Sequence, residues 1–267
     1  LVLGGGCALN SSCNGRLLSR TPFKALHVPS APADDGTALG AAWLAWRLDH
    51  PDAALPEGPL SPYLGSAIDQ DRLDRVIRHG GLTVSRHPDD LETVVAAELA
   101  RGRIVAWMQG RAEFGPRALG NRSILADPRD PHMKRRLNAE VKFREAFRPF
   151  APAILDEHGP AWFEDYQTAP YMERALRFRP EQRRQVPAVV HADGTGRVQS
   201  VRLDGNPRFH HLLTEFHRLT GVPVLLNTSL NRMGRPMAHS VEDALALFLT
   251  SGLDLLVIDD WLLRKSG

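Results

Sequence analysis

The stretch from Gly110 to Phe150 concentrates positive charge around glycine and proline rather than along a regular helix. It holds ten Lys and Arg residues against five Asp and Glu residues. Two glycines bracket Arg117, and glycine lets a backbone approach a ligand closely while Arg offers a planar fork to phosphate or carboxylate oxygens. The stretch therefore predicts an anion-binding loop. The alternative is a solvated basic face, in which Glu140 and Glu145 pair with the neighbouring cations.

Two later segments bring further polar side chains to the ends of expected strands. The apolar run Val222–Leu226 leads into Asn227, Thr228, Ser229 and Asn231. This ending places amides and hydroxyls at the carboxyl edge of a sheet, where α/β proteins bind ligands; a polar turn that caps the strand is the alternative. The segment Val189–Val201, with Asp193 and Gly194 at its centre, is typical of a β-hairpin. Arg197 leaves that turn, although most hairpin arginines are ordinary surface residues.

Two turns near the amino terminus also have residues that suit a ligand. The triplet Gly4–Gly6, followed by Asn10, lies between an expected strand and an expected helix and suits a nucleotide phosphate or ribose. Asp34 and Asp35 lie at the next strand-to-helix turn. These two carboxylates could either cap the following helix or bind a metal, and the sequence alone supports both roles equally.

Hydrophobic periodicity predicts the elements that position these residues. Helices are expected at residues 8–19, 37–48, 69–79, 90–101, 132–141, 207–219 and 241–250. Strands are expected at residues 1–3, 24–30, 104–108, 123–126, 188–191, 198–201, 223–226 and 255–258. Their interleaving predicts an α/β or α+β fold with a mixed sheet. The segment Asp49–Gly65 has four prolines and no periodicity, and is expected to be a linker.

Composition limits the classes of function. The 267 residues are 43% apolar and 24% charged, which fits one large globular domain or two ordinary ones. A net charge of +2 excludes a surface built to coat nucleic acid or membrane.

Cys7 and Cys13 fit neither a zinc site nor a redox pair, and are expected to be small buried hydrophobes. Because the chain has no signal peptide and no long apolar run, we expect a cytoplasmic protein. Since it starts without Met inside an expected strand, we also expect a fragment of a longer protein.

Six segments together resemble the O-carbamoyltransferases of the nodulation and antibiotic-tailoring type. They are GGGCALNSSCNGRLL, PADDGTALGAA, QGRAEFGPRALGNRSILADPR, NAEVKFREAFRPFAPAIL, HADGTGRVQSV and LLNTSLNRMGRPMAHSVEDALALFLTSGLDLLVI. They occur in the family's order and span nearly the whole chain. The chain departs from the family at its front, where the segment with the metal-binding histidines is absent. It also departs at Gly6 and Asp35, where the family often has Val and Ala.

The resemblance implies two domains with successive reactions. Residues 1–60 would be the C-terminal piece of a domain with the actin-like ATPase fold, and residues 61–267 a YrdC-like mixed α/β domain with a twisted sheet. The YrdC-like domain would make carbamoyl-adenylate from carbamoyl phosphate and ATP with Mg²⁺. The actin-like domain would pass the carbamoyl group to a hydroxyl of a small-molecule acceptor, a secondary metabolite or sugar, with Fe²⁺ as its metal. Because every motif of the first step lies after residue 100, the second domain is expected to perform that step alone.

Motif position also implies the site residues. Lys142, Arg117 and Arg148 are expected to act in catalysis. The residues expected to bind substrate or nucleotide are Arg197, Ser229, Thr228, Asn231, Arg122, Gly5, Gly6 and Asn10, and Asp34 is the expected metal ligand. Lysine is rare here, at four of 33 cationic residues. We therefore expect Lys142 to act as a compact point charge on the reacting oxygens, which a planar guanidinium could not replace.

A non-catalytic YrdC-like module that binds a nucleotide or RNA is the alternative function. RNA readers stack bases on exposed aromatic side chains, whereas Phe114, Phe143, Phe147 and Phe150 are expected to be apolar anchors among the cations. The sequence therefore favours the enzyme, and disfavours nucleic acid and membrane as partners. The expected partner is the missing N-terminal part of the actin-like domain, which would also determine the choice of acceptor.

Overall fold

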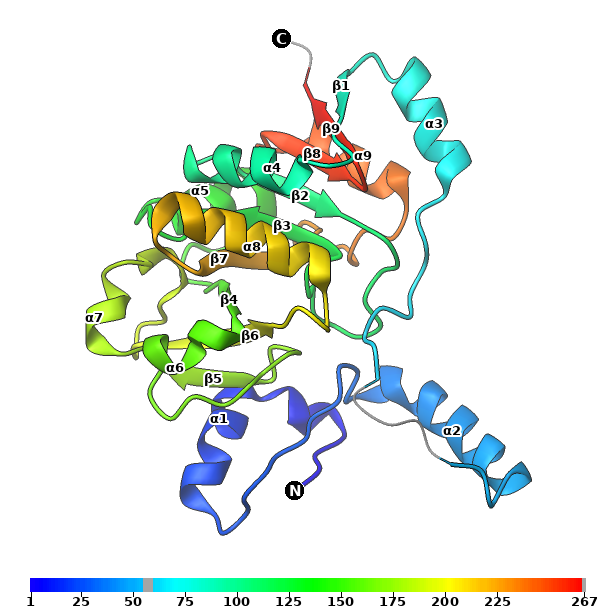
Figure 1. The fold of residues 1–267 in the computed structure, drawn as a ribbon, viewed down its shortest axis with the longest axis vertical. Helices are drawn as coiled ribbons and strands as arrows, with labels where there is room; N and C mark the ends of the chain where they lie inside the picture. Colours follow the sequence, from blue (N-terminus) through cyan, green and yellow to red (C-terminus); the bar gives the residue numbers. More distant parts are fainter. Residues whose placement is uncertain (55–59, 266–267) are drawn as a thin grey trace.

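A mixed β-sheet forms the centre of the protein. The computed structural model describes residues 1–54 and 60–265. The strands among these residues are β1 (Thr83–Arg86), β2 (Val105–Met108), β3 (Arg122–Ala126), β4 (Ala151–Leu155), β5 (Arg174–Arg177), β6 (Thr195–Val201), β7 (Val224–Ser229), β8 (Leu255–Ile258) and β9 (Trp261–Arg264). They form one sheet in the order β1-β9-β8-β2-β3-β7-β4-β6-β5. β2 pairs with β8 and β4 with β6 in parallel, and the other neighbours are antiparallel. The prediction of a mixed α/β fold with a twisted sheet is confirmed (Figure 1).

Helices cover the sheet and extend from it. They are α1 (Ser11–Arg20), α2 (Asp34–Asp49), α3 (Gln70–His79), α4 (Leu91–Ala100), α5 (Met133–Leu137), α6 (Gly159–Trp162), α7 (Pro180–Arg183), α8 (Pro207–Thr220) and α9 (Val241–Leu249). Figure 1 shows α4 and α8 side by side over one face of the sheet, and the two helices are in contact. Within the described ranges, no helix is long and apolar enough to cross a membrane.

The central strands and α8 form the main apolar core. Every residue of β2, β3, β4 and β8 is buried, as expected for β2, β4 and β8, whose sequences are continuous apolar runs. Asn206 caps the start of α8, where its side chain accepts a hydrogen bond from the amide of Phe209. Gly221 caps the end of the helix in the left-handed conformation. Phe209 and Phe216 on its inner face are fully buried. Burial of each such side chain contributes about 1.5–3 kcal/mol.

Most predicted elements are present, with small shifts at their ends. The helices expected near residues 37, 69, 90, 207 and 241 correspond to α2, α3, α4, α8 and α9, and the strands expected near 104, 123, 223 and 255 to β2, β3, β7 and β8. Two predicted helices are interrupted. The one at 8–19 breaks at Asn10, which caps α1 through its side chain, and the one at 132–141 passes from α5 into a π-helical turn, Asn138–Lys142.

The predicted hairpin at Val189–Val201 is wrong. The turn at Gly194 is present, but the segment before it is a short 3-10 turn rather than a strand. That segment begins with Pro187, which has no amide hydrogen for a ladder hydrogen bond. β6 pairs instead with β5 and β4.

The strands expected at 1–3 and 24–30 are reduced to one bridge between Val2 and His27. Residues 55–59 of the predicted linker lie outside the described residues.

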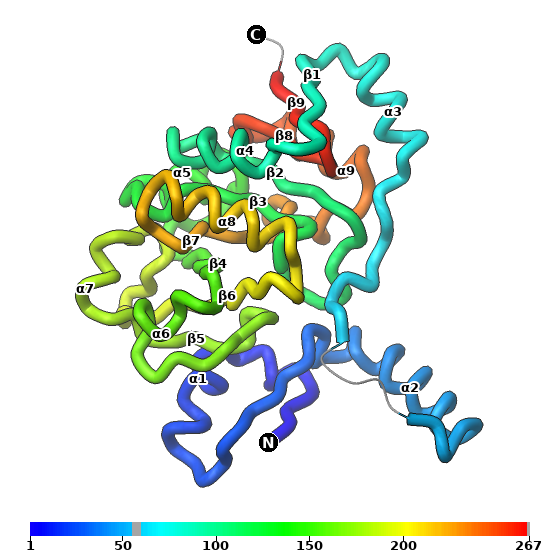
Figure 2. Tube along the Cα trace, viewed as in Figure 1, coloured from blue at the N-terminus to red at the C-terminus, as the bar shows by residue number. Residues whose placement is uncertain are grey.

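The first thirty residues pack against the edge of the sheet at β5. The buried side chain of Asn14 donates hydrogen bonds to the carbonyls of Ala8, at 2.7 Å, and Glu173, at 2.9 Å. Arg174 donates to the carbonyl of Leu26 at 2.6 Å. Figure 2 shows this segment beside β5, while α2 extends away from the rest of the chain. α2 has no buried residue, and its Leu44 and Leu48 are exposed.

The buried carboxyl group of Glu173 makes the stability of the protein sensitive to pH. Burial raises the pKa of Glu173 to about 6 from a reference of 4.5, although Arg174 opposes the shift. The folded protein therefore binds more protons than the unfolded chain between these two pKa values. The stability contributed by protonated Glu173 is fully present below pH 4.5 and is lost as pH rises through 6. At 1.36 kcal/mol per pKa unit, the loss is on the order of 2 kcal/mol.

We expect Glu173→Gln to remove this component of the pH dependence. Urea unfolding of both proteins from pH 4 to pH 7 gives the difference in their free energies of unfolding. That difference should change by about 2 kcal/mol across the window. A difference that stays constant with pH would show that Glu173 has an ordinary pKa.

Candidate anion-binding site

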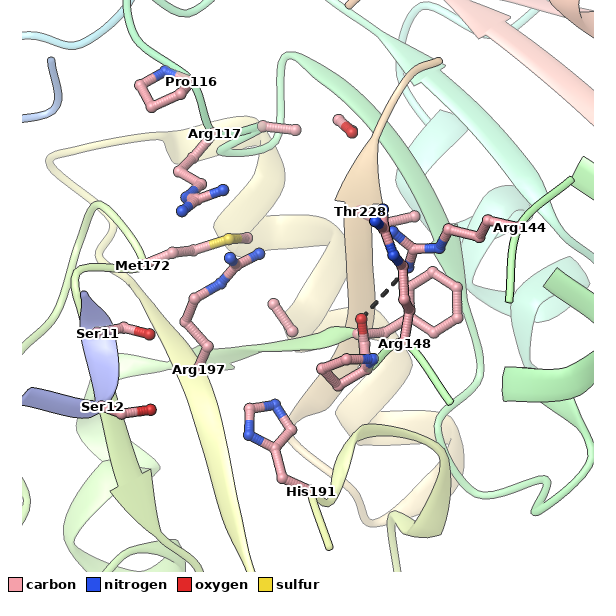
Figure 3. Close-up of a pocket in the computed structure, with 15 residues that line it drawn as sticks. Ser11, Ser12, Pro116, Arg117, Arg144, Arg148, Met172, His191, Arg197 and Thr228 are labelled. Atoms are coloured by element: carbon pink, nitrogen blue, oxygen red, sulfur yellow. Dashed lines mark hydrogen bonds between the residues drawn. The ribbon is translucent and has the colours of Figure 1, made fainter. Parts of the chain in front are cut away.

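A cavity of about 490 Å³ lies where α1, the ends of β4 and β7, β6 and four loops meet. Its lining residues are Ser11, Ser12, Pro116, Arg117, Ala118, Arg144, Arg148, Pro149, Phe150, Ala151, Met172, His191, Arg197, Thr228 and Ser229. Figure 3 shows the side chains of Arg117 and Arg197 on one side of the cavity and those of Arg144 and Arg148 on the other. The structure thus brings together five of the predicted site residues, namely Arg117, Arg148, Arg197, Thr228 and Ser229.

Arg117 and Arg197 have no acidic partner among the described residues. The Nε atom of Arg197 is buried without a hydrogen-bond partner. Burial, together with the nearby guanidinium groups of Arg117 and Arg144, lowers the pKa of Arg197 to about 9. Burial also lowers the pKa of Arg117. Buried charges are normally paired, since an isolated ion is costly to remove from water. Two uncompensated guanidinium groups facing one cavity therefore indicate a site for an anion.

Arg144 and Arg148 form the opposite wall and are partly satisfied by the protein. Arg144 donates to the Asn138 side chain at 2.7 Å, and its guanidinium lies 4.8 Å from the centre of the Phe150 ring. Arg148 pairs with Glu145 at 3.2 Å, and both side chains are nearly half exposed. Arg144 was absent from the predicted site. Its position two residues after Lys142 was visible in the sequence, but nothing there shows that the backbone turns between them.

Lys142 does not line the cavity, contrary to the expectation that it touches the reacting oxygens. It is 2% exposed, and its ammonium lies among four oxygens from Ser229 and Asn231. The contacts to the Asn231 carbonyl and side chain are 2.9 and 3.0 Å. Burial lowers the pKa of Lys142 well below its usual value, and Arg144 adds to this effect. Lys142 therefore holds the end of β7 in place from the interior of the protein. It is linked to the cavity through Ser229, which lines the cavity and accepts its hydrogen bonds.

The residue between Lys142 and Arg144 accounts for their different directions. Phe143 has φ 50°, in the left-handed region that residues other than glycine seldom adopt. Its side chain is 51% exposed, and that of Phe147 is 76% exposed. The expectation that both are apolar anchors is wrong; of the four aromatics in this set only Phe150 is fully buried. The backbone turn at Phe143 places the lysine in the interior and the arginine at the cavity.

Arg122 is also outside the cavity. It is fully buried, and its guanidinium donates to the carbonyls of Gln109, Asn121, Ser66 and Gly110 at 2.8 to 3.1 Å. Its buried Nε has no partner among the described residues, but both terminal nitrogens are occupied by these bonds and Arg122 does not line the cavity. A single arginine in a strand does not reveal this arrangement in the sequence, because three of its four acceptors are backbone carbonyls of other segments.

Glu113, which sequence reasoning did not single out, organises the loop that bears Arg117. One oxygen of its buried carboxylate accepts hydrogen bonds from the amides of Leu119, Asn121 and Arg122 at 2.6, 2.9 and 3.2 Å. The other oxygen is buried without a partner among the described residues. Burial raises the pKa of Glu113, against the lowering effect of these backbone bonds. The loop therefore has its shape because it wraps around one carboxylate.

We expect Glu113→Ala to destabilise the protein by on the order of 3 kcal/mol, because three buried amides lose their acceptor. Glu113→Gln keeps an acceptor at the same place, so its cost should be about 1 kcal/mol. Urea unfolding midpoints measure both effects. Equal midpoints for wild type and Glu113→Ala would show that the loop does not depend on this side chain.

His191 completes the lower wall of the cavity and was also missed, although it begins the HADGTGRVQSV motif. Its Nδ1 lies 3.2 Å from the hydroxyl of Thr195, which donates to Asp193 at 2.7 Å. Burial lowers the pKa of His191, against the opposing effect of Asp193. The ring is therefore neutral at pH 7 and offers one nitrogen as a hydrogen-bond acceptor.

The remaining predicted residues lie together in the N-terminal segment. The amide of Gly5 donates to the carbonyl of Pro32, two residues before Asp34. Gly6 begins a short 3-10 turn that ends before Asn10. Asp34 is exposed at the start of α2. In the ranges 1–54 and 60–265, no three His, Cys, Asp or Glu side chains gather as a metal site, so the residues present do not by themselves fit Fe²⁺. Cys7 and Cys13 are exposed, which corrects the prediction that they are buried.

Two sequence models of protein families match the chain. The carbamoyltransferase C-terminus matches residues 96–265, and the carbamoyltransferase N-terminus matches residues 1–43. The cavity is lined by residues from both ranges, since Ser11 and Ser12 lie in the second. The domain boundary predicted near residue 60 falls between them and stays a prediction.

Curated relatives match almost the whole chain. Nodulation protein NolNO of Sinorhizobium fredii is 42% identical across 99% of this chain and 40% of its own length. Nodulation protein NolO of Bradyrhizobium diazoefficiens is 41% identical across 99% of this chain and 49% of its own. The 3'-hydroxymethylcephem-O-carbamoyltransferase of Amycolatopsis lactamdurans is 38% identical across 100% of this chain and 49% of its own. The chain spans less than half the length of these relatives.

Solved structures show weaker similarity. Full-length HypF in the phosphate- and nucleotide-bound form aligns with a TM-score of 0.45 and 20% identity, over 69% of this chain and 23% of that one. P. abyssi Sua5 aligns with a TM-score of 0.42 and 14% identity, over 65% of this chain and 49% of that one. The sequence matches are decisive: with one family model covering residues 96–265 and relatives about 40% identical along its length, this chain belongs to the carbamoyltransferase family.

Proposed function

We propose that the arginine-lined cavity binds carbamoyl phosphate and ATP and forms carbamoyl-adenylate, the activated donor for O-carbamoylation. The observation that carries the proposal is the absence of a counter-charge for Arg117 and Arg197 among the described residues. A volume of about 490 Å³ is in the range of small-molecule sites. Both proposed substrates are multiply anionic, so they would supply the missing negative charge. Membership of a family with O-carbamoyltransferase relatives supports the same chemistry.

The reaction would take place in two steps that balance with one water molecule. First, water hydrolyses the bond between the carbamoyl group and phosphate, which releases inorganic phosphate and a carbamate. The carbamate oxygen then attacks the α-phosphorus of ATP, the bond to the β-phosphate breaks, and pyrophosphate leaves. Negative charge accumulates on phosphoryl oxygens in this transition state, and fixed cations stabilise it without reorganising. Arg117, Arg197 and Arg148 would bind these oxygens, while Lys142 would hold Ser229 in place.

The second reaction would transfer the carbamoyl group to a hydroxyl of a small-molecule acceptor. We propose that Gly5, Gly6, Asn10 and Asp34 belong to that transfer site, together with residues of the preceding part of the actin-like domain. Asp34 would supply one carboxylate to Fe²⁺, and the other ligands would come from the preceding part of that domain, since the described residues hold no cluster of three metal-binding side chains. Mg²⁺ would enter with ATP as part of the substrate.

Pyrophosphate release by the chain, with ATP and carbamoyl phosphate present, tests the first step. The proposal predicts release that saturates with each substrate and requires both. Exposed Phe143 and Phe147, close to Arg144 in the chain, would suit a stacked RNA base. Folded protein that releases no pyrophosphate, yet binds single-stranded RNA with steep dependence on salt, would favour the binding module instead.

A further inference from the structure

The first turn of α1 presents free polar groups to the arginine-lined cavity. Ser11 and Ser12 both line it, and Figure 3 shows their hydroxyls directed toward the side of Arg197. Among the described residues, neither hydroxyl makes a hydrogen bond, and neither residue's amide is satisfied by the Asn10 side chain, which accepts from Cys13 instead. Free amides and the positive end of the helix dipole make such a turn attractive to anions.

A second, independent feature indicates a ligand at the same place. Arg197 is aimed into the cavity, and its buried Nε has no hydrogen-bond partner. The first turn of α1 brings no carboxylate, so it cannot be the counter-ion of Arg197. Two sets of unsatisfied donors, from α1 and from β6, therefore face one space. Only an acceptor that is not part of the described chain can satisfy both.

The packing of α1 fixes this arrangement. Gly15 lies so close to β5 that a Cβ atom there would meet the carbonyl oxygen of Ala175 at 2.1 Å. Ala175 is the β5 residue paired with Arg197 of β6. Asn14 anchors the same helical turn to the carbonyl of Glu173. The start of α1 is thus held at a set position relative to Arg197, as a binding wall requires.

We infer that Ser11 and Ser12 bind a phosphoryl group of the ligand held by Arg117 and Arg197, so that the site is shared between the N-terminal and C-terminal family segments. The inference rests on the proposed function for the identity of the ligand. The phosphoryl group belongs to carbamoyl phosphate or to ATP, and the two have the same recognition chemistry. It also means that residues 61–267 alone lack one wall of the first-step site, contrary to the expectation drawn from the sequence.

The test compares Ser11→Ala/Ser12→Ala with wild type, with pyrophosphate and inorganic phosphate as binding probes in calorimetry. We expect the double variant to bind its probe roughly ten- to a hundredfold more weakly, because bonds to charged acceptors are lost. The KM values in the pyrophosphate-release assay separate the sources: a rise for carbamoyl phosphate or a rise for ATP identifies whose phosphoryl group contacts α1. Ser19→Ala is the matched control, since Ser19 lies in the last turn of the same helix and donates to Arg16.

Gly15→Ala tests the same wall without removing a hydroxyl. The added methyl must displace α1 from β5, so this variant should also bind pyrophosphate more weakly while both serines remain. Unchanged affinity and KM values in Ser11→Ala/Ser12→Ala would overturn the inference, even if wild type makes carbamoyl-adenylate. Weaker pyrophosphate binding by the double variant would uphold it, even if wild type proves inactive and the proposed function fails.

Discussion

Arg197→Ala is expected to reduce pyrophosphate release by roughly a hundredfold to a thousandfold. The guanidinium is uncompensated in the resting protein, so its charge is available to oxygens that gain charge in the transition state. Loss of one such preorganised donor typically costs about 3–4 kcal/mol, and each 1.36 kcal/mol is about tenfold in rate. Initial rates at saturating ATP and carbamoyl phosphate measure the effect. Because Arg197 repels Arg117 and Arg144, the variant should fold at least as stably as wild type.

Arg135→Ala is the matched control for this prediction. Arg135 is exposed, and its side chain has no hydrogen bond or ion pair among residues 1–54 and 60–265. Arg136 would be a poor choice, since it pairs with Glu140 and Asp254. Arg135→Ala should keep its rate within about twofold of wild type. If Arg197→Ala also keeps a near-normal rate, the uncompensated charge does not act on the reacting groups, and the proposed site is wrong.

Lys142→Arg is expected to be strongly impaired although it preserves the charge. Lys142 is 2% exposed, and its ammonium lies among oxygens of Ser229 and Asn231. A planar guanidinium is larger and directs its donors along fixed lines, so it cannot occupy that point. We expect Lys142→Arg to lose about 2–4 kcal/mol of stability through overpacking and unsatisfied acceptors. Displacement of Ser229 should lower the rate by roughly a hundredfold.

Two measurements on Lys142→Arg separate positioning from direct contact. Urea unfolding reports the stability, and pyrophosphate release with increasing carbamoyl phosphate reports kcat and KM. Loss of stability together with lower activity is the outcome expected for a buried residue that holds the end of β7. Normal stability with greatly reduced kcat would instead indicate that Lys142 reaches the reacting oxygens. Normal values of both would contradict either role.

The sequence predicted the parts of this site that depend on local pattern. Arg117 lies between glycines, Arg197 follows a Gly-containing turn, and Thr228 and Ser229 end an apolar run. Such features depend only on a few neighbouring residues in the sequence, and the structure brings all four of these side chains to one cavity. The capping box of Ser240 and Asp243 at α9 was predictable for the same reason.

The features that were missed depend on contacts between distant segments. Lys142 meets Ser229 and Asn231, which lie 87 and 89 residues further along the chain. The position of α1 depends on Asn14 and Glu173, which are 159 residues apart. The predicted hairpin failed because β6 finds its partners in β4 and β5 rather than in the adjacent segment. No periodicity in a single sequence encodes these pairings.

Exchange of labelled pyrophosphate into ATP tests the central claim most directly, because only reversible formation of an adenylate at the α-phosphorus produces it. Our account predicts that the chain catalyses this exchange only when carbamoyl phosphate is present, and that Arg197→Ala abolishes it while Arg135→Ala does not. Exchange that proceeds without carbamoyl phosphate, or none from folded protein that binds both substrates, would contradict the assignment of carbamoyl-adenylate formation to this cavity.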